Sequence, residues 1–407
     1  MNAYISYLND LLNEHKLAYK AFSTLRWLNP YEAVEYQQQR DALMQNFKAD
    51  ALFKGTKPYL TNISPGCQLC GQGLWSCLFI TGKCNANCFY CPSAQKEDDW
   101  PTSQGLTFKT PEAYAEYINY FGFQGASFSG GEPLLFKEKT MAYIRELRHS
   151  CSPDLYIWIY TNGILGNASI YKKLGQAGLN EIRFDIGATG FSIEKLRGAA
   201  GFIPNVTIEI PAVPEEKEKL KSMIPEIINA GVTRINLHQM RLTPYNAPQL
   251  EKRNYTFIAA ERPIVMESEL AALEIMEYAR EKGFNIGINY CSFYFKYRFQ
   301  KAGYRKILAQ RLKPDAVLTE CYYIRDKKKN QLMYENFLFA DEGRLIMPPK
   351  KLKLKHKIYD YHKVTAHSTS INNNDLKNLI NKPNPPENKH DFDIWKHECL
   401  EQGLRAY

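Results

Sequence analysis

Short apolar runs alternate with amphipathic stretches through the middle of the chain, and this pattern predicts repeated βα units. Strand–helix alternation is typical of a parallel sheet whose strands are buried on both faces. The sequence therefore predicts an α/β fold, a partial (β/α)6-type TIM barrel with its chemistry at the C-terminal ends of the strands. The expected strands lie at 77–81, 125–129, 155–160, 181–187, 205–213, 234–240 and 285–291, and the expected helices near 111–121, 135–149, 168–178, 215–229 and 267–282.

The pattern changes on both sides of this core, which is expected to span residues 77–292. Residues 1–76 predict a helical N-terminal extension that ends in a turn-rich loop, GTKPYLTNISPGCQLCGQG. Residues 293–407 predict an α+β C-terminal extension that faces the substrate or a partner. Its expected elements are a basic helix in FKYRFQKAGYRKILAQRL, a hairpin in NFLFADEGRLIM, an edge strand in KKLKLKHK and a linker or mobile loop in INNNDLKNLINKPNPPENKH.

Composition and cysteine usage narrow the class of protein. Of the 407 residues, 44% are hydrophobic and 23% are charged, values that are ordinary for a folded soluble protein. The sequence contains no run of about 18 apolar residues and no apolar signal core at its start, so a cytoplasmic protein is expected. Six of the ten cysteines lie within residues 67–91. Such a cluster in a cytoplasmic protein indicates metal or redox chemistry rather than a disulfide scaffold.

The segment CNANCFYC carries the strongest chemical signal, because it places Cys84, Cys88 and Cys91 on a compact loop directly after the first predicted strand. A structural zinc site normally has four protein ligands. A [4Fe-4S] cluster normally has four cysteine ligands. Three cysteines would leave one iron open, and an open coordination site is what metal-based catalysis requires. A zinc site is the alternative interpretation of the spacing alone.

The triplet, its place after the first strand and the aromatic Tyr90 before the last cysteine together resemble the radical S-adenosylmethionine (radical SAM) superfamily. The segment Ser129-Gly130-Gly131-Glu132-Pro133, at the end of the second strand, resembles the GGEP motif of that family. The resemblance implies a [4Fe-4S] cluster whose open iron binds S-adenosylmethionine and cleaves it to a 5′-deoxyadenosyl radical. It further implies that Tyr90 flanks the adenine and that Glu132 accepts a hydrogen bond from the methionyl ammonium, while the glycines let the backbone approach the ligand.

Three further positions resemble the branch related to the pyruvate formate-lyase-activating enzyme. Asn162 lies in a TNG segment at the end of the third strand, Asp185 is late in the fourth strand and His238 is in the sixth. The resemblance implies that all three contact S-adenosylmethionine. The chain departs from that branch in having Tyr160 where an acid is common and Gly187 where a lysine is common. His238 and Asp185 could equally have structural roles.

A second metal site is expected around the CxxC pair of Cys67 and Cys70, because two thiolates in a turn-rich loop can chelate a metal. The hypothesis adds Cys291, at the end of the seventh strand, and Cys321 as partners. The bound group would be an auxiliary iron–sulfur cluster or a single metal ion. The alternative is a set of buried thiols that pack as small hydrophobes.

The positive charge is confined to one part of the chain. Residues 301–407 hold 21 Lys or Arg against 13 Asp or Glu, which accounts for nearly all of the net charge of +9. Basic residues with interleaved aromatics can bind nucleic acid, although an acidic peptide or a solvated face fits the charge as well. The interleaved aromatics are Tyr322, Tyr323, Tyr359 and Tyr361.

The sequence therefore predicts a radical SAM enzyme that abstracts hydrogen from a substrate, with a peptide or protein favoured and RNA as an alternative. An activase-like or peptide-modifying reaction is expected, with a one-electron donor such as flavodoxin or ferredoxin and no membrane partner. A non-catalytic, metal-binding module that contacts nucleic acid is the second hypothesis. A cobalamin-dependent methyltransferase is a third, although no cobalamin domain precedes the barrel. No residue is assigned as a substrate acid or base.

Overall fold

The computed structural model describes residues 3–47, 51–95, 100–328, 331–339, 348–382 and 384–399. Its largest sheet has ten strands in the order β2-β13-β10-β9-β8-β7-β6-β3-β4-β5. The strands from β13 to β3 run parallel, whereas β2 (Tyr59–Leu60) and β4 (Thr102–Ser103) pair antiparallel with the two ends of that run. β5 (Leu106–Thr107) pairs antiparallel with β4. Because β3 and β13 do not pair, the barrel is open, and the predicted partial TIM barrel is confirmed.

The seven parallel strands lie close to their predicted ranges. They are β3 (Trp75–Phe79), β6 (Gly125–Ser129), β7 (Tyr156–Thr161), β8 (Glu181–Phe184), β9 (Asn205–Pro211), β10 (Arg234–His238) and β13 (Gly287–Cys291). Each predicted strand exists, and most end two to three residues earlier than the apolar run does. The residues just beyond the strand ends belong to the loops that form the candidate site.

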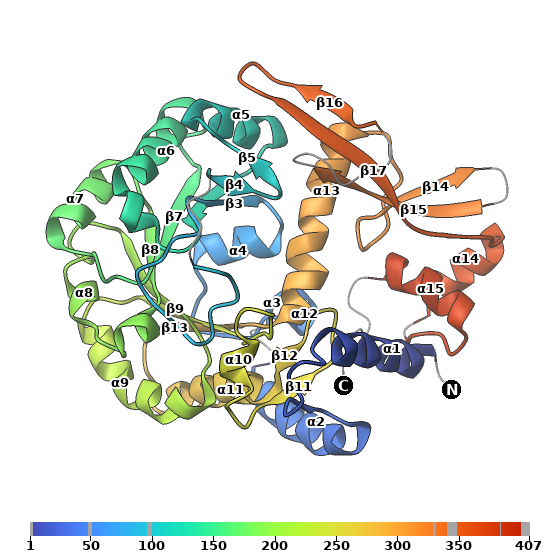
Figure 1. Ribbon diagram of the computed structural model, residues 1–407, viewed down its shortest axis with the longest axis horizontal. Coiled ribbons are helices and arrows are strands. Elements are labelled where there is room, and N and C mark those ends of the chain that lie inside the picture. The colour runs from blue at the N-terminus through green and yellow to red at the C-terminus, as the bar shows by residue number, and fades with distance from the viewer. Residues whose placement is uncertain are drawn as a thin grey trace.

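Helices cover the outer face of this sheet (Figure 1). The main ones are α5 (Pro111–Phe121), α6 (Lys137–Ser150), α7 (Ala168–Gln176), α9 (Lys217–Asn229) and α11 (Met266–Glu281), and all five were predicted. Thr110 caps α5 by accepting a hydrogen bond from the Ala113 N–H, and Asn167 caps α7 in the same way through Ile170. Short connecting elements are η1 (Pro133–Phe136), η2 (Ile186–Thr189), α8 (Glu194–Arg197) and η3 (Pro214–Glu216).

Part of the turn-rich segment before the barrel is helical, so the prediction of a loop was wrong for residues 65–71. α4 (Pro65–Gly71) begins at Ser64, whose hydroxyl accepts from the Cys67 N–H, and Pro65 occupies the first helical turn. Pro at that position favours a helix start, and it was interpreted as a turn signal instead. Figure 1 shows α4 inside the ring of strands. The positive-φ Gly73 lies directly against Gly303, and a Cβ on either residue would meet the other backbone within 2.7 Å.

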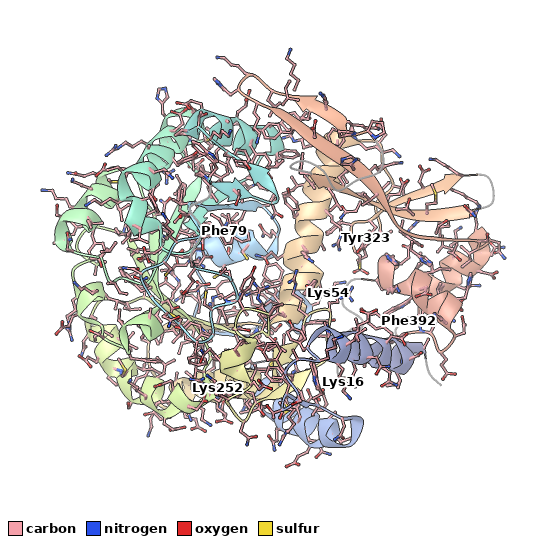
Figure 2. The ribbon with its side chains drawn as sticks, in the orientation of Figure 1. Lys16, Lys54, Phe79, Lys252, Tyr323 and Phe392 are labelled. Atoms are coloured by element: carbon pink, nitrogen blue, oxygen red, sulfur yellow. The ribbon has the colours of Figure 1, made fainter. Side chains whose placement is uncertain are left out.

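The remaining N-terminal elements are α1 (Ala3–Ala18), α2 (Pro30–Gln45) and α3 (Leu52–Gly55), as the helical extension predicted. A small separate sheet joins β1 (Arg26–Trp27), β11 (Thr256–Ile258) and β12 (Ile264–Val265), with α10 (Ala247–Leu250) beside it. α1 packs against the C-terminal helix α15 (Lys389–Glu398), where the ring centroids of Tyr7 and Phe392 are 5.6 Å apart (Figure 2). The two ends of the chain therefore share one apolar cluster.

The basic helix after β13 is present as α12 (Phe293–Phe295), a π-helical turn η4 (Lys296–Gln300) and α13 (Lys301–Leu312). Beyond it, β14 (Ile324–Lys328), β15 (Gln331–Phe339), β17 (Ile358–Thr369) and β16 (Lys350–Lys353) form an antiparallel sheet in that order. β16 is an edge strand with exposed lysines, as predicted. The Asp-Glu-Gly centre of the predicted hairpin lies outside the described residues.

The Asn- and Pro-rich segment predicted as a linker instead contains α14 (Asn373–Ile380), so that prediction was wrong. The Asn372 side chain accepts from the N–H groups of Asn374 and Asp375, which makes it the N-cap of this helix. Among the described helices, none combines the length and the apolar character that crossing a bilayer requires.

Candidate S-adenosylmethionine and iron–sulfur site

The loop that carries Cys84, Cys88 and Cys91 is joined by its backbone to the GGEP turn. The Gly131 N–H donates to the Thr81 carbonyl at 2.7 Å, and the Glu132 N–H donates to the Lys83 carbonyl at 2.8 Å. A Cβ on Gly130 would lie 2.3 Å from the Thr81 carbonyl oxygen, and one on Gly131 would lie 2.0 Å from that of Lys83. The two glycines are therefore required for the GGEP turn to contact the start of the cysteine loop.

Gly131→Ala is expected to displace the cysteine loop and to lower the free energy of unfolding by about 1–3 kcal/mol, the usual cost of an added atom in a packed site. Iron content after anaerobic reconstitution and a thermal melt would measure both effects. Gly201→Ala is the matched control, because a Cβ there meets nothing within 4 Å. Equal iron content and equal melting temperatures in the two variants would contradict the role of Gly131.

Glu132 links the GGEP turn to the TNG turn after β7. Its carboxylate accepts from the Leu134 N–H at 2.8 Å, the Thr161 hydroxyl at 2.9 Å and the Asn162 N–H at 2.7 Å. Its side chain is fully buried, and burial raises the pKa of this carboxyl to about 7. The protein itself supplies these donors, so Glu132 fixes the two turns relative to each other. Contact with a methionyl ammonium stays a prediction.

Asn162 connects the TNG turn to the first cysteine. Its amide nitrogen donates to the Asn85 side-chain oxygen at 2.7 Å and lies 3.6 Å from the Cys84 sulfur. The Ala86 N–H also donates to that sulfur, at 3.4 Å. Hydrogen bonds to sulfur are one means by which proteins set the reduction potential of an iron–sulfur cluster. Asn85 was not predicted as a site residue, although its place inside the motif could have indicated it.

Tyr90 and Asp185 contact each other across the mouth of the barrel. The tyrosine hydroxyl donates to the Asp185 carboxylate at 2.8 Å, and burial raises the pKa of that carboxyl to about 6. A Cβ on Gly187 would lie 2.4 Å from the Tyr90 oxygen. Gly187, which departs from the activase-related pattern, therefore leaves space for the Tyr90 hydroxyl. On the far side of the loop, the Asn246 amide donates to the Tyr90 carbonyl at 3.1 Å, a contact that the sequence did not indicate.

His238 lies deeper in the barrel, between an acid and a lysine. Its Nε2 is 2.6 Å from the Glu209 carboxylate, and its Nδ1 is 3.1 Å from the Lys296 ammonium nitrogen. Burial, then the charge of Lys296, lowers the pKa of the histidine. Nearby Arg183, together with His238, holds the pKa of Glu209 well below its usual range despite burial. Neutral His238 thus accepts from Lys296 and donates to Glu209, and no described contact joins it to the cysteine loop.

The three thiols of the triplet lie close enough to raise one another's pKa values, since Cys91 acts on both Cys84 and Cys88. Burial is the larger cause and raises the pKa of Cys88 to about 12. No group of three His, Cys, Asp or Glu in the described part of the chain is arranged to hold a single metal ion. A cluster differs in this respect, because each cysteine binds a different iron and the sulfurs need not surround one ion.

The four cysteines predicted for the second metal site do not all have the same surroundings. Cys67, Cys70 and Cys291 are neighbours, and their charges act on one another. Cys321 belongs to the same apolar cluster as Cys291, but its thiol donates to the Cys399 carbonyl at 3.1 Å. The Cys321 thiol is thus turned toward the C-terminal segment, and among the described residues no hydrogen bond joins it to Cys67, Cys70 or Cys291.

Two of the four aromatic residues noted in the basic C-terminal region are packed against other parts of the protein. Tyr359 is 1% exposed, and its hydroxyl donates to the Ala113 carbonyl of α5 at 3.0 Å. Tyr323, labelled in Figure 2, packs edge-to-face on His397 and stacks under the Arg305 guanidinium. These rings belong to the packing of the C-terminal sheet, so the interpretation of interleaved stacking residues was wrong for them.

Comparison with known proteins identifies the class. Residues 78–203 match the model of the Radical SAM superfamily. The chain is 30% identical over 239 residues to a Methanocaldococcus jannaschii protein with the provisional name of a glycyl-radical enzyme activating enzyme. The match covers 56% of this chain and 62% of that relative, so this chain spans less than two thirds of the relative's length. Residues 78–203 are therefore a radical SAM domain, and the resemblance to the activase-related branch is confirmed.

Two other likenesses carry different names. The chain is 28% identical over 124 residues to the Fe-coproporphyrin III synthase of Methanosarcina barkeri, which covers 30% of this chain and 29% of that protein. The crystal structure of Streptococcus suis SuiB bound to S-adenosylmethionine superposes with a TM-score of 0.37 and 14% identity, over 70% of this chain and 61% of that chain. The structural likeness adds nothing to the sequence match.

The residues of the site fit the cofactors of this family, a [4Fe-4S] cluster and S-adenosylmethionine. Cys84, Cys88 and Cys91 supply three thiolates on one loop, and two N–H groups point at the first of them. The loop lies at the C-terminal edge of the sheet, where Glu132, Asn162 and Asp185 also lie at or just beyond strand ends. These are the residues that would hold the cluster and its ligand.

Proposed function

We propose that this protein is a radical SAM enzyme that abstracts a hydrogen atom from a peptide or protein. The observation that carries the proposal is the set of contacts by which Gly131, Glu132 and Asn162 fix the cysteine loop to the GGEP and TNG turns. Three sequence motifs that lie far apart in the chain thereby form one site, within the residues that match the family.

When bound at Cys84, Cys88 and Cys91, the cluster would supply the one electron that cleaves S-adenosylmethionine to methionine and the 5′-deoxyadenosyl radical needed for hydrogen abstraction. The protein positions these groups. Cys84, Cys88 and Cys91 would hold three irons, and Asn162 directs its N–H toward the Cys84 sulfur. Tyr90, held by Asp185 and Asn246, would form the wall on the adenine side.

A peptide or protein substrate is favoured over RNA by two observations. The relative from Methanocaldococcus jannaschii is named for activating a glycyl-radical enzyme, which is a protein substrate. In this chain, two of the four aromatic rings proposed to stack on RNA bases, Tyr323 and Tyr359, are packed against other parts of the protein. The electron donor in this proposal is a flavodoxin or a ferredoxin.

The test is formation of 5′-deoxyadenosine from S-adenosylmethionine by the anaerobically reconstituted protein after reduction with dithionite. The wild-type protein is expected to form it, and Cys88→Ala is expected to lose the activity at least 100-fold because one iron loses its ligand. Cys151→Ala is the matched control: its thiol donates to the Ala115 carbonyl on the outer helices, and it should keep the wild-type rate. Absence of the product in a protein that holds its cluster would overturn the proposal.

A further inference from the structure

Three cysteines outside the CNANCFYC loop lie together in the barrel, and each sulfur faces a nitrogen donor. The Asn236 amide donates to the Cys67 sulfur at 3.4 Å, and the Gln300 amide donates to the Cys70 sulfur at 3.0 Å. The Lys57 ammonium donates to the Cys291 sulfur at 2.6 Å. Free cysteines that pack as small hydrophobes lie among apolar groups. All three sulfurs here accept a hydrogen bond, as a metal-bound thiolate does. The Cys291 thiol also donates to the Asn289 side-chain oxygen at 3.7 Å and packs in an apolar cluster with Phe295.

The burial of Lys57 is a second observation. It is 0% exposed, and its ammonium contacts the Asn289 side-chain oxygen at 2.7 Å, the Cys291 sulfur and the face of Phe295. None of the ion pairs found among the described residues joins Lys57 to a carboxylate. Burying an ammonium without an anionic partner is costly, so the negative charge has to come from the sulfurs.

The charges balance if the sulfurs bind a metal core. Three thiolates alone would repel one another in a buried site. Arg183 and Lys296 also act on these sulfurs, but the carboxylates of Glu181 and Glu209 offset those two positive charges. The one remaining ammonium, that of Lys57, cannot neutralise three thiolates. A dipositive core held by three thiolates carries one net negative charge, and the one ammonium of Lys57 compensates it. A single metal ion is disfavoured, because no group of three His, Cys, Asp or Glu side chains in the described part of the chain is arranged around one metal position. A [4Fe-4S] core binds each cysteine through a different iron, and the sulfurs can then stand apart.

The surrounding backbone is built to hold these sulfurs. Cys67 and Cys70 lie on α4, whose end is fixed against α13 by the close contact of Gly73 with Gly303. Gln300, the donor to Cys70, is the last residue of the π-helical turn η4. Turns of this kind inside helices are rare and occur frequently at functional sites. Lys296, at the other end of the same turn, reaches His238, which pairs in register with Cys291 on the next strand.

We propose that Cys67, Cys70 and Cys291 bind a second [4Fe-4S] cluster inside the barrel, with the buried Lys57 as its counter-charge. Cys321 is not a ligand, because its thiol donates to the C-terminal segment. The second cluster is separate from the one at Cys84, Cys88 and Cys91. Its presence therefore does not depend on whether the protein cleaves S-adenosylmethionine.

The test is iron and sulfide counting on the full-length protein after anaerobic reconstitution. The wild-type protein is expected to hold about eight irons, and the triple variant Cys84→Ala/Cys88→Ala/Cys91→Ala about four, with a brown absorbance that remains. Adding Cys67→Ala and Cys70→Ala to the triple variant should remove the rest. Adding Cys151→Ala instead is the matched control and should leave about four irons in place.

A folded triple variant without iron would overturn the second cluster, as would a wild-type protein with about four irons and one equivalent of zinc. Circular dichroism establishes whether the triple variant is folded. If it does not fold, Cys67→Ala/Cys70→Ala in the otherwise wild-type chain decides the question. That variant should hold about half the wild-type iron if the proposal is correct, and all of it if the proposal is wrong.

Discussion

Between pH 5 and pH 8, the free energy of unfolding of the wild-type protein is expected to fall by on the order of 3 kcal/mol because of Glu132. The Glu132→Gln variant should not show this loss. Burial raises the pKa of Glu132 from 4.5 to about 7. The folded chain therefore holds this proton more tightly than the unfolded chain does. The stabilisation is complete below about pH 4.5, falls as the pH rises and is gone above about pH 7.

Guanidinium unfolding of both proteins before cluster reconstitution, at several pH values, measures this difference. Burial raises the pKa of Asp185 to about 6, and this residue makes the free energy of unfolding fall with pH in both proteins. The difference between the wild-type protein and the variant therefore cancels the contribution of Asp185. Glu138→Gln, an exposed acid on α6, should keep the wild-type slope. Parallel pH profiles for the wild-type protein and Glu132→Gln would show that Glu132 is not buried between the GGEP and TNG turns as described.

Arg183→Met is expected to lower the free energy of unfolding by about 3–5 kcal/mol, because it leaves buried carboxylates without their cation. The guanidinium is 2% exposed and bonds Glu209 at 2.8 Å and Glu181 at 3.0 Å. It also donates to the Ser64 hydroxyl that caps α4. The substitution therefore removes the charge balance of the barrel interior and loosens the helix that carries Cys67 and Cys70.

Denaturant unfolding measures the effect, and Arg197→Met is the matched control. Arg197 pairs with Glu226 at 2.9 Å, but both side chains are about half exposed, and such pairs contribute only about 0–1 kcal/mol. Equal losses in the two variants would mean that the interior ion pairs are no more important than a surface pair.

The barrel could be predicted because its strands are buried on both faces. Runs such as CLFIT and LYIWIY are apolar along their length, and amphipathic stretches of helical length lie between the strands. α4 and α14 could not be predicted in the same way, because proline, glycine and asparagine mark both turns and helix starts. Only the contacts that Ser64 and Asn372 make distinguish the two cases.

Some residues of the candidate sites could be predicted from the sequence, and others could not. The cysteine triplet, Glu132 and Asn162 lie in local motifs with distinctive spacing, and the structure brings them together. Cys321 could not be excluded from sequence, since its partner is a carbonyl 78 residues away. Lys57 carried no signal at all, because a lone lysine in a turn-rich segment is ordinarily exposed. Its burial follows from strand β13, which places Asn289 and Cys291 on either side of it.

In the proposed function, the cluster at Cys84, Cys88 and Cys91 keeps one iron open for S-adenosylmethionine. Electron paramagnetic resonance of the dithionite-reduced protein detects this open iron, and the Cys67→Ala/Cys70→Ala background lets the triplet cluster be seen alone. Adding S-adenosylmethionine should change the spectrum, because its amino and carboxylate groups would bind that iron. A reduced four-iron spectrum that S-adenosylmethionine leaves unchanged would contradict the account.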